Sequence, residues 1–119
     1  MQGSLLTNCH VFCTVIDNYG DLGVCWRLAR HLADEHALVV TLWVDDLHSF
    51  RQIASDINPA HSSQMLGNIC IRHWESDTVD TAPGDLIIEG FACNLPTSYI
   101  SAMAARSSPP VWINLEYLS

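Results

Sequence analysis

The sequence predicts an α/β domain built on a doubly wound, Rossmann-like parallel sheet. Apolar, β-branched runs alternate along the chain with segments in which apolar residues recur at helical spacing. The runs are mostly continuous rather than alternating, as expected of strands that are buried on both faces. A length of 119 residues is enough for one such domain with one hydrophobic core.

The first predicted strand covers residues 11–16, a continuous and largely β-branched apolar run. A polar segment with two glycines follows at 17–23 and predicts a loop. Apolar residues then recur at helical spacing over 24–35, which predicts the first helix. This strand, loop and helix form the first unit of the sheet.

The second unit begins with an apolar run at 38–44, which predicts the second strand. Asp45 and Asp46 come next and are placed to cap a helix over 47–54. Residues 56–68 are polar and predict a loop.

The remaining elements repeat the alternation. Residues 69–74 and 85–89 predict the third and fourth strands. Pro96 opens a predicted helix that ends near Arg106, and 111–114 predict the fifth strand. Since an open α/β sheet normally continues with a covering helix, we expect the chain to be part of a longer protein. An uncovered last strand would expose a sheet edge and apolar surface.

Right-handed crossover connections limit the possible strand orders, and we predict the order 3-2-1-4-5. Ligands of such sheets bind outside the carboxyl ends of the strands, where the strand order reverses. This rule brings residues 17–21, 89–91 and 114–116 to one edge of the sheet.

The loop after the first strand is the main candidate site. Asp17 and Asp21 are two carboxylates four residues apart, and Gly20 and Gly23 allow a sharp turn and a close approach to a ligand. Asp21 is also predicted near a helix N-terminus, where the helix dipole stabilises an anion. The alternative is structural, with Asp21 as a helix cap and Asp17 in an Asx-turn. Their predicted position leaves both interpretations open.

Other sites are less well supported. The loop lacks the Gly-x-Gly-x-x-Gly dinucleotide motif, and the chain has no Lys for a phosphate loop. Asp45 and Asp46 are better explained as a helix cap than as a site. Glu89 and Glu116 lie at strand ends and could line a cleft, although a solvated loop acid is the better interpretation of each. The histidines show no metal-ligand spacing, so we predict no metal.

Charge and cysteine content narrow the functional class. The chain has 13 acidic and 5 basic residues and a net charge of −8, which argues against nucleic-acid binding. The charge favours a cationic partner, or it serves solubility alone. Five cysteines without a Cys-x-x-Cys pair predict free thiols in a reducing cytoplasm. Neither a signal peptide nor a membrane-spanning run is visible.

Four stretches closely resemble one bacterial family, the protein-arginine rhamnosyltransferases that modify elongation factor P. The longest is FCTVIDNYGDLGVCWRLAR at 12–30. The others are LWVDD at 42–46, IEGFAC at 88–93 and WINLEYLS at 112–119. The resemblance spans essentially the whole chain, while members of the family are much longer.

The resemblance implies the first half of a GT-B glycosyltransferase, with residues 1–119 as a truncated, acceptor-side domain and the nucleotide-sugar domain absent. The implied activity transfers rhamnose from dTDP-β-L-rhamnose to an arginine of elongation factor P, with inversion and without a cofactor. By position, Asp21 matches the family's proposed general base and Asp17 its companion carboxylate. The backbone of Asn18, Tyr19 and Gly20, together with Gly23, is expected to shape the sugar pocket.

Three functional hypotheses follow. The first is the amino-terminal part of this rhamnosyltransferase, which would be inactive by itself. The second is a fragment that docks elongation factor P without catalysis. The third is a generic nucleotide-binding Rossmann domain. The sequence does not decide which of Asp17 and Asp21 accepts the proton.

Overall fold

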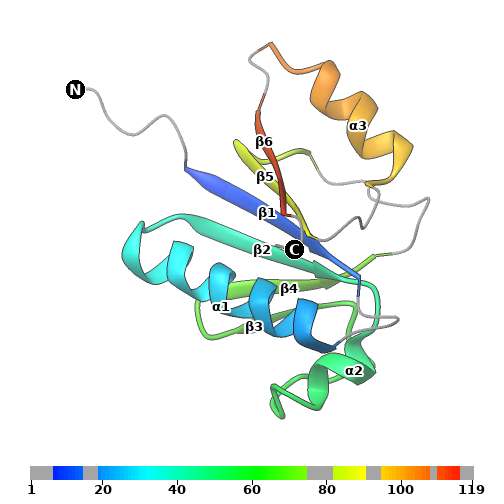
Figure 1. The fold of residues 1–119 in the computed structure, drawn as a ribbon. Helices are drawn as coiled ribbons and strands as arrows, with labels where there is room; N and C mark the ends of the chain where they lie inside the picture. Colours follow the sequence, from blue (N-terminus) through cyan, green and yellow to red (C-terminus); the bar gives the residue numbers. More distant parts are fainter. Residues whose placement is uncertain (1–6, 15–18, 75–81, 91–94, 108–109, 116–119) are drawn as a thin grey trace.

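The computed structural model describes residues 7–14, 19–74, 82–90, 95–107 and 110–115. Over these ranges the chain forms six strands and three helices (Figure 1). The strands are β1 (Asn8–Cys13), β2 (Val39–Val44), β3 (Ser63–Leu66), β4 (Ile69–His73), β5 (Leu86–Gly90) and β6 (Val111–Leu115). The helices are α1 (Tyr19–Glu35), α2 (Leu47–Arg51) and α3 (Thr97–Ala104).

These strands form one mixed sheet in the order β3-β4-β2-β1-β5-β6. The predicted class is therefore confirmed as α/β, but the predicted order 3-2-1-4-5 is wrong, because the sheet has a further strand that runs antiparallel. The parallel pairs β1–β2, β1–β5, β2–β4 and β5–β6 are the ones that the prediction contained. The additional strand joins at the edge and leaves these pairs unchanged.

The strand that the sequence did not predict is β3. It lies inside the segment predicted as a loop and pairs antiparallel with β4. It has four residues, and exposed and half-buried positions alternate along it. Gly67 has φ 62° in the turn to β4, a backbone conformation that glycine adopts without strain. A strand that is so short and polar gives little apolar pattern in the sequence. The hairpin turn at Gly67 is what brings it beside β4.

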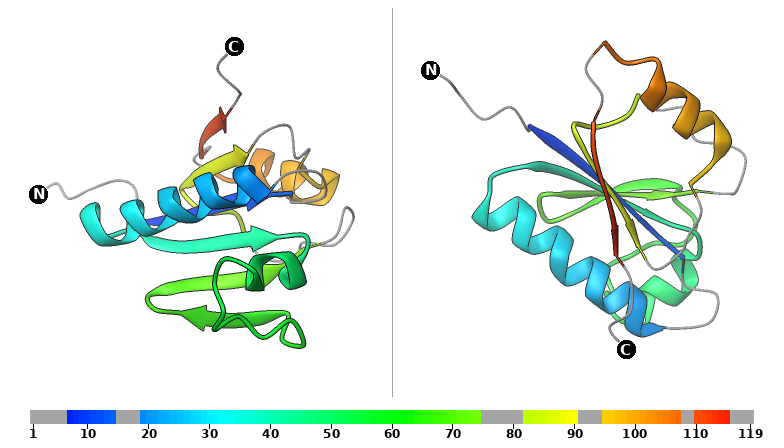
Figure 2. Two further views of the ribbon diagram at one scale, coloured as in Figure 1. Left: turned by 60° about the horizontal axis from the view of Figure 1, so that its bottom comes forward. Right: turned by 45° about the horizontal axis from the view of Figure 1, so that its top comes forward.

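Helix α1 covers one face of the sheet and packs against β1, β2 and β4 (Figure 2). Alternate residues of β1, from Cys9 to Cys13, point into this core. From α1, Cys25 and Ala29 are completely buried against them. The small side chains bring the helix close to the strands.

The opposite face carries α3 and an aromatic layer made of Phe12, Trp43, Trp74 and Tyr99. Phe12 stacks on Trp43 with ring centroids 5.5 Å apart and planes inclined by 5°. The rings of Tyr99 and Trp74 meet Phe12 edge-on at 4.8 and 5.6 Å, an arrangement that adds to simple apolar burial. The layer ties α3 to the middle of the sheet.

A buried polar cluster lies beside the aromatic layer. Nδ1 of His10 is 2.8 Å from the hydroxyl of Tyr99 and 3.4 Å from Nε1 of Trp43. The hydroxyl of Tyr99 also accepts the backbone N–H of Gly84 at 3.3 Å. The predicted first strand starts at residue 11, three residues after β1 begins. The polar residues Asn8 and His10 interrupt the apolar pattern there, although His10 is in fact buried and hydrogen-bonded.

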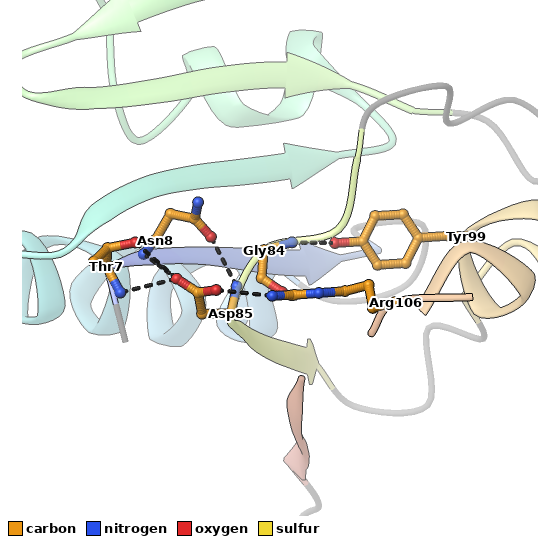
Figure 3. A network of polar contacts seen from close by, with 6 residues as sticks. All are labelled: Thr7, Asn8, Gly84, Asp85, Tyr99 and Arg106. Carbon is orange, nitrogen blue, oxygen red and sulfur yellow. Dashed lines mark hydrogen bonds and ion pairs between the residues drawn. The ribbon is translucent and has the colours of Figure 1, made fainter. Parts of the chain in front are cut away.

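At the amino ends of β1 and β5, Asp85 joins three parts of the chain (Figure 3). Its Oδ2 accepts the backbone N–H of Thr7 at 2.9 Å and the Thr7 hydroxyl at 2.7 Å. Its Oδ1 forms an ion pair with Nη2 of Arg106 at 3.0 Å. Arg106 also donates to the Gly84 carbonyl, and Asn8 Oδ1 accepts the Asp85 N–H at 2.7 Å. These contacts fix the start of β5 and the end of α3.

The edge strand β6 is less covered than the rest of the sheet. Val111, Trp112 and Ile113 are 47%, 48% and 43% exposed. The expectation that the last strand exposes an edge and apolar surface is confirmed for these residues. No helix in the described ranges is both long enough and apolar enough to cross a membrane.

Candidate functional site at the switch point

The candidate site lies where the carboxyl ends of the parallel strands meet. β1 pairs with β2 on one side and with β5 on the other, so the strand order reverses at β1. Phe12, Glu89 and Asn114 stand opposite one another across β1, β5 and β6. The carboxyl ends of β1, β5 and β6 therefore share one edge, as the sequence predicted.

The predicted catalytic and binding residues stand at the beginning of α1. Asp17 and Asn18 lie outside the described residues. Tyr19, Gly20 and Asp21 are the first three residues of α1, which begins earlier than the predicted helix. Asp21 is thus inside the first turn and is not the capping residue. This position puts its backbone at the positive end of the helix dipole.

Gly23 lies within the second turn of α1 instead of in the predicted loop. A Cβ atom added to it would have no heavy atom within 4 Å. The packing of the described protein atoms thus does not require glycine at this position. The two glycines hid the helix start from the sequence pattern, since glycine disfavours helix by about 1 kcal/mol.

Gly90 ends β5 at the same edge, where the sequence placed residues 89–91 without giving this glycine a role. A Cβ atom there would be 2.9 Å from Sγ of Cys25 and 2.9 Å from the backbone oxygen of Phe12. Cβ atoms do not approach heavy atoms so closely, so only glycine lets β5, β1 and α1 meet at this point. A glycine that ends a buried strand was the available signal.

Glu89 precedes Gly90 and is buried, with 7% of its surface exposed. The indole N–H of Trp112 donates to its Oε1 over 3.1 Å. The prediction that Glu89 is a solvated loop acid is wrong, because its strand runs one residue further and β6 covers it. Glu116 lies outside the described residues.

A cavity opens at the carboxyl ends of β2 and β4, beside the candidate site. This cavity of about 350 Å³ is lined by Asp45, Asp46, Leu47, His48, Pro59, Ala60, Ser62 and His73. The predicted cap is confirmed, because Asp46 accepts the backbone N–H of Ser49 at 3.2 Å and its hydroxyl at 2.7 Å. These bonds, the hydroxyl first, lower the pKa of Asp46. His73 Nε2 donates to the carbonyl of Asp45 over 2.9 Å.

The thiols that the structure describes are free. Cys9, Cys13 and Cys25 are buried and Cys70 is half-buried, as the sequence predicted for unpaired cysteines. Burial raises the pKa of the Cys9 thiol to about 12, so it stays protonated at neutral pH. Within the described ranges, no three His, Cys, Asp or Glu side chains lie close enough together to hold a metal ion.

Comparison with known proteins gives a consistent result. Residues 9–119 match the family described as "Elongation-Factor P (EF-P) rhamnosyltransferase EarP". The chain is 50% identical over 109 residues to a protein-arginine rhamnosyltransferase of Pseudomonas putida, and 47% identical over 109 residues to one of Pseudomonas aeruginosa. It is 46% identical over 115 residues to one of Shewanella oneidensis.

Each match covers most of this chain but only a small part of the relative. The covered shares are 92% of this chain and 29% of the relative. The chain therefore spans about three-tenths of the length of the proteins that it resembles.

Proposed function

The chain belongs to the family of elongation factor P rhamnosyltransferases, and from this premise we propose that it is the acceptor-side part of an inverting glycosyltransferase. The complete enzyme moves rhamnose from dTDP-β-L-rhamnose to an arginine of elongation factor P. The observation that carries the proposal is that the family likeness runs through β1, α1 and the ends of β5 and β6, the elements that build the switch-point edge.

The chemistry requires activation of a guanidinium, which is protonated at neutral pH and is a poor nucleophile. In the proposed step, a guanidinium nitrogen forms a bond to the anomeric carbon while the bond to the dTDP oxygen breaks. The dTDP leaves with the bonding electrons, and a carboxylate accepts the proton that the nitrogen loses. A single displacement of this kind inverts the anomeric carbon.

We assign proton acceptance to Asp21 and the holding of the acceptor arginine to Asp17. The position of the Asp21 backbone in the first turn of α1, a regular element, supports this assignment. A negative charge at this edge also stabilises the positive charge that develops on the sugar in the transition state. The backbone of Asn18, Tyr19, Gly20 and Gly23 is proposed to shape the sugar pocket.

The charge of the chain supports a basic acceptor surface. The net charge is −8 with no Lys, and an acidic surface attracts a cationic protein at long range. The hollow lined by Asp45 and Asp46 adds polar surface at the same edge of the sheet. The free thiols are consistent with a reaction in the cytoplasm.

We place the nucleotide-sugar site in a second α/β domain, as in a GT-B fold, outside these 119 residues. The chain by itself is then expected to dock elongation factor P without catalysis. A generic dinucleotide-binding role has less support, because the connection from β1 to α1 lacks the Gly-x-Gly-x-x-Gly motif.

The test uses the full-length protein that contains this chain, purified elongation factor P and dTDP-β-L-rhamnose. The expected result is one added deoxyhexose on one arginine of elongation factor P, detected by mass spectrometry of the intact protein and its peptides. Replacing that arginine by Lys should abolish the addition. Transfer to a different residue type, or none with the wild-type pair, would contradict the proposal.

A further inference from the structure

We propose that Gly90 and Cys25 are positioning residues, which together seat the beginning of α1 on the sheet and so fix where Asp21 stands. The inference rests on the proposed function for its catalytic consequence. Its structural basis is independent of that function, because it depends only on the contact between the end of β5 and α1.

The contact between Gly90 and Cys25, here called the seat, leaves no space for a larger side chain at residue 90. Cys25 is 0% exposed, and its Sγ is 2.9 Å from the place that a Cβ on residue 90 would occupy. The backbone oxygen of Phe12 is at the same distance from that place and belongs to the paired strand β1. A thiol can rotate by a small amount, whereas a strand carbonyl in a buried sheet moves only with the strand.

The seat is one helical turn from the proposed base. Cys25 follows Asp21 by four residues in α1, so both positions lie on the same side of the helix. A displacement of the helix at Cys25 is therefore carried to the backbone at Asp21. Farther along α1, Ala29 and Ala33 are also buried and hold the rest of the helix on the sheet.

Gly84 provides a matched control on the same strand segment. A Cβ there would be 2.7 Å from Oδ1 of Asn8 and 3.1 Å from a ring carbon of His10, so substitution also crowds β1. Gly84 precedes β5, however, and lies at the opposite edge of the sheet from the proposed site. The two glycines differ in location and also in the atoms that a Cβ would meet. At Gly84 the two nearest atoms belong to side chains, whereas at Gly90 one of the two nearest is the strand carbonyl of Phe12.

The experiment compares Gly90→Ala with Gly84→Ala in the full-length enzyme. Both substitutions should lower the melting temperature. Gly90→Ala should also lower kcat by about tenfold to a hundredfold, because small misplacements of catalytic groups have effects of this size. Gly84→Ala should leave kcat unchanged. Equal kcat values in the two folded variants would overturn the inference.

A second pair covers the case in which a glycine variant does not fold. Cys25→Ala removes the thiol from the seat, and Cys9→Ala removes an equally buried thiol from the amino end of β1 in the same core. Only Cys25→Ala should reduce kcat. A similar reduction in both would mean that core loosening, and not the seat, controls the rate.

Hydrogen exchange separates this inference from the proposed function. Backbone amides in the first two turns of α1 should exchange faster in Gly90→Ala than in Gly84→Ala, whether or not the protein transfers rhamnose. If wild-type protein shows no transfer but the exchange difference is present, the proposed function fails and the seat stands. If wild-type protein is active but the exchange difference is absent, the seat fails and the proposed function stands.

Discussion

The hydroxyl of Tyr99 lies 2.8 Å from Nδ1 of His10 and forms a buried hydrogen bond with it. The indole N–H of Trp43 also points at Nδ1, from 3.4 Å, and an indole nitrogen only donates. Nδ1 is therefore the acceptor, and the single ring proton is on Nε2. Burial, with a smaller effect from the charge of Arg72, lowers the pKa of His10 to about 4.

The first prediction concerns the pH dependence of stability. Because the folded-state pKa of His10 lies below the unfolded value of about 6.5, the unfolded chain binds more protons between these two values. The free energy of unfolding should therefore fall as the pH falls from about 6.5 to about 4, by up to ~3 kcal/mol from this residue. Urea unfolding followed by circular dichroism across this range measures the slope.

His10→Gln should flatten that slope relative to wild type, because glutamine does not titrate. His61 is exposed, and His61→Gln serves as the matched control. If the two variants have the same slope, protonation of His10 is not what destabilises the protein in acid.

The second prediction is that Tyr99→Phe destabilises the protein without changing its secondary structure. The phenylalanine ring keeps the edge-on contact with Phe12, but the Gly84 N–H loses its buried partner, and Nδ1 of His10 keeps only the longer contact with Trp43. Leaving a buried polar group unsatisfied costs about 1–3 kcal/mol. Calorimetry should show a lower melting temperature, and an unchanged value would contradict the role given to the hydroxyl.

The third prediction concerns the ion pair between Asp85 and Arg106. Hydrogen bonds from Thr7, and then from Arg106, hold the pKa of Asp85 well below its usual range. The stabilisation by the Asp85 carboxylate is therefore present above about pH 4 and is lost as the pH falls further. Asp85→Asn should lower the free energy of unfolding at neutral pH by about 1–2 kcal/mol. The exposed residue Asp56 provides the control variant Asp56→Asn, for which no such loss is expected.

The fourth prediction is catalytic. Asp21→Asn in the full-length enzyme should reduce transfer to elongation factor P by about a thousandfold, the size of a lost general base, and leave the melting temperature within error of wild type. Asp34→Asn, near the other end of α1, is the control. Near-normal transfer by Asp21→Asn would remove the role assigned to this residue.

Asp17→Asn separates the two carboxylates. If Asp17 holds the acceptor arginine, its loss should mainly raise KM for elongation factor P, whereas loss of the base mainly lowers kcat. If Asp17→Asn lowers kcat without raising KM for elongation factor P, then Asp17 is the proton acceptor and Asp21 holds the acceptor arginine.

Sequence patterns predicted the parallel core because its strands are long apolar runs, and they predicted the Asp46 cap because an acid preceded an apolar helix. They failed where local preference and tertiary structure disagree. β3 is too short and polar to be recognised without the turn at Gly67, and α1 begins in a segment with two glycines that disfavour helix.

The candidate site was predictable to a similar extent. The position of a segment after a central strand follows from topology alone, so the edge that carries Asp21 could be predicted. The burial of Glu89 and the crowding at Gly90 could not, because both depend on which side chains the neighbouring strand and helix bring to that point. The pairing of Asp17 with Asp21 remains a prediction.

The aromatic layer also gives the protein its own optical probe. Trp43 and Trp74 are 2% and 4% exposed, whereas Trp112 is 48% exposed. Trp26 in α1 is half-buried. Acrylamide or iodide should therefore quench the emission of Trp112 most strongly and that of Trp26 less, and leave a blue-shifted component from the two buried indoles. Any molecule that covers β6 would protect Trp112 from the quencher, so its docking can be followed in solution without attaching a dye.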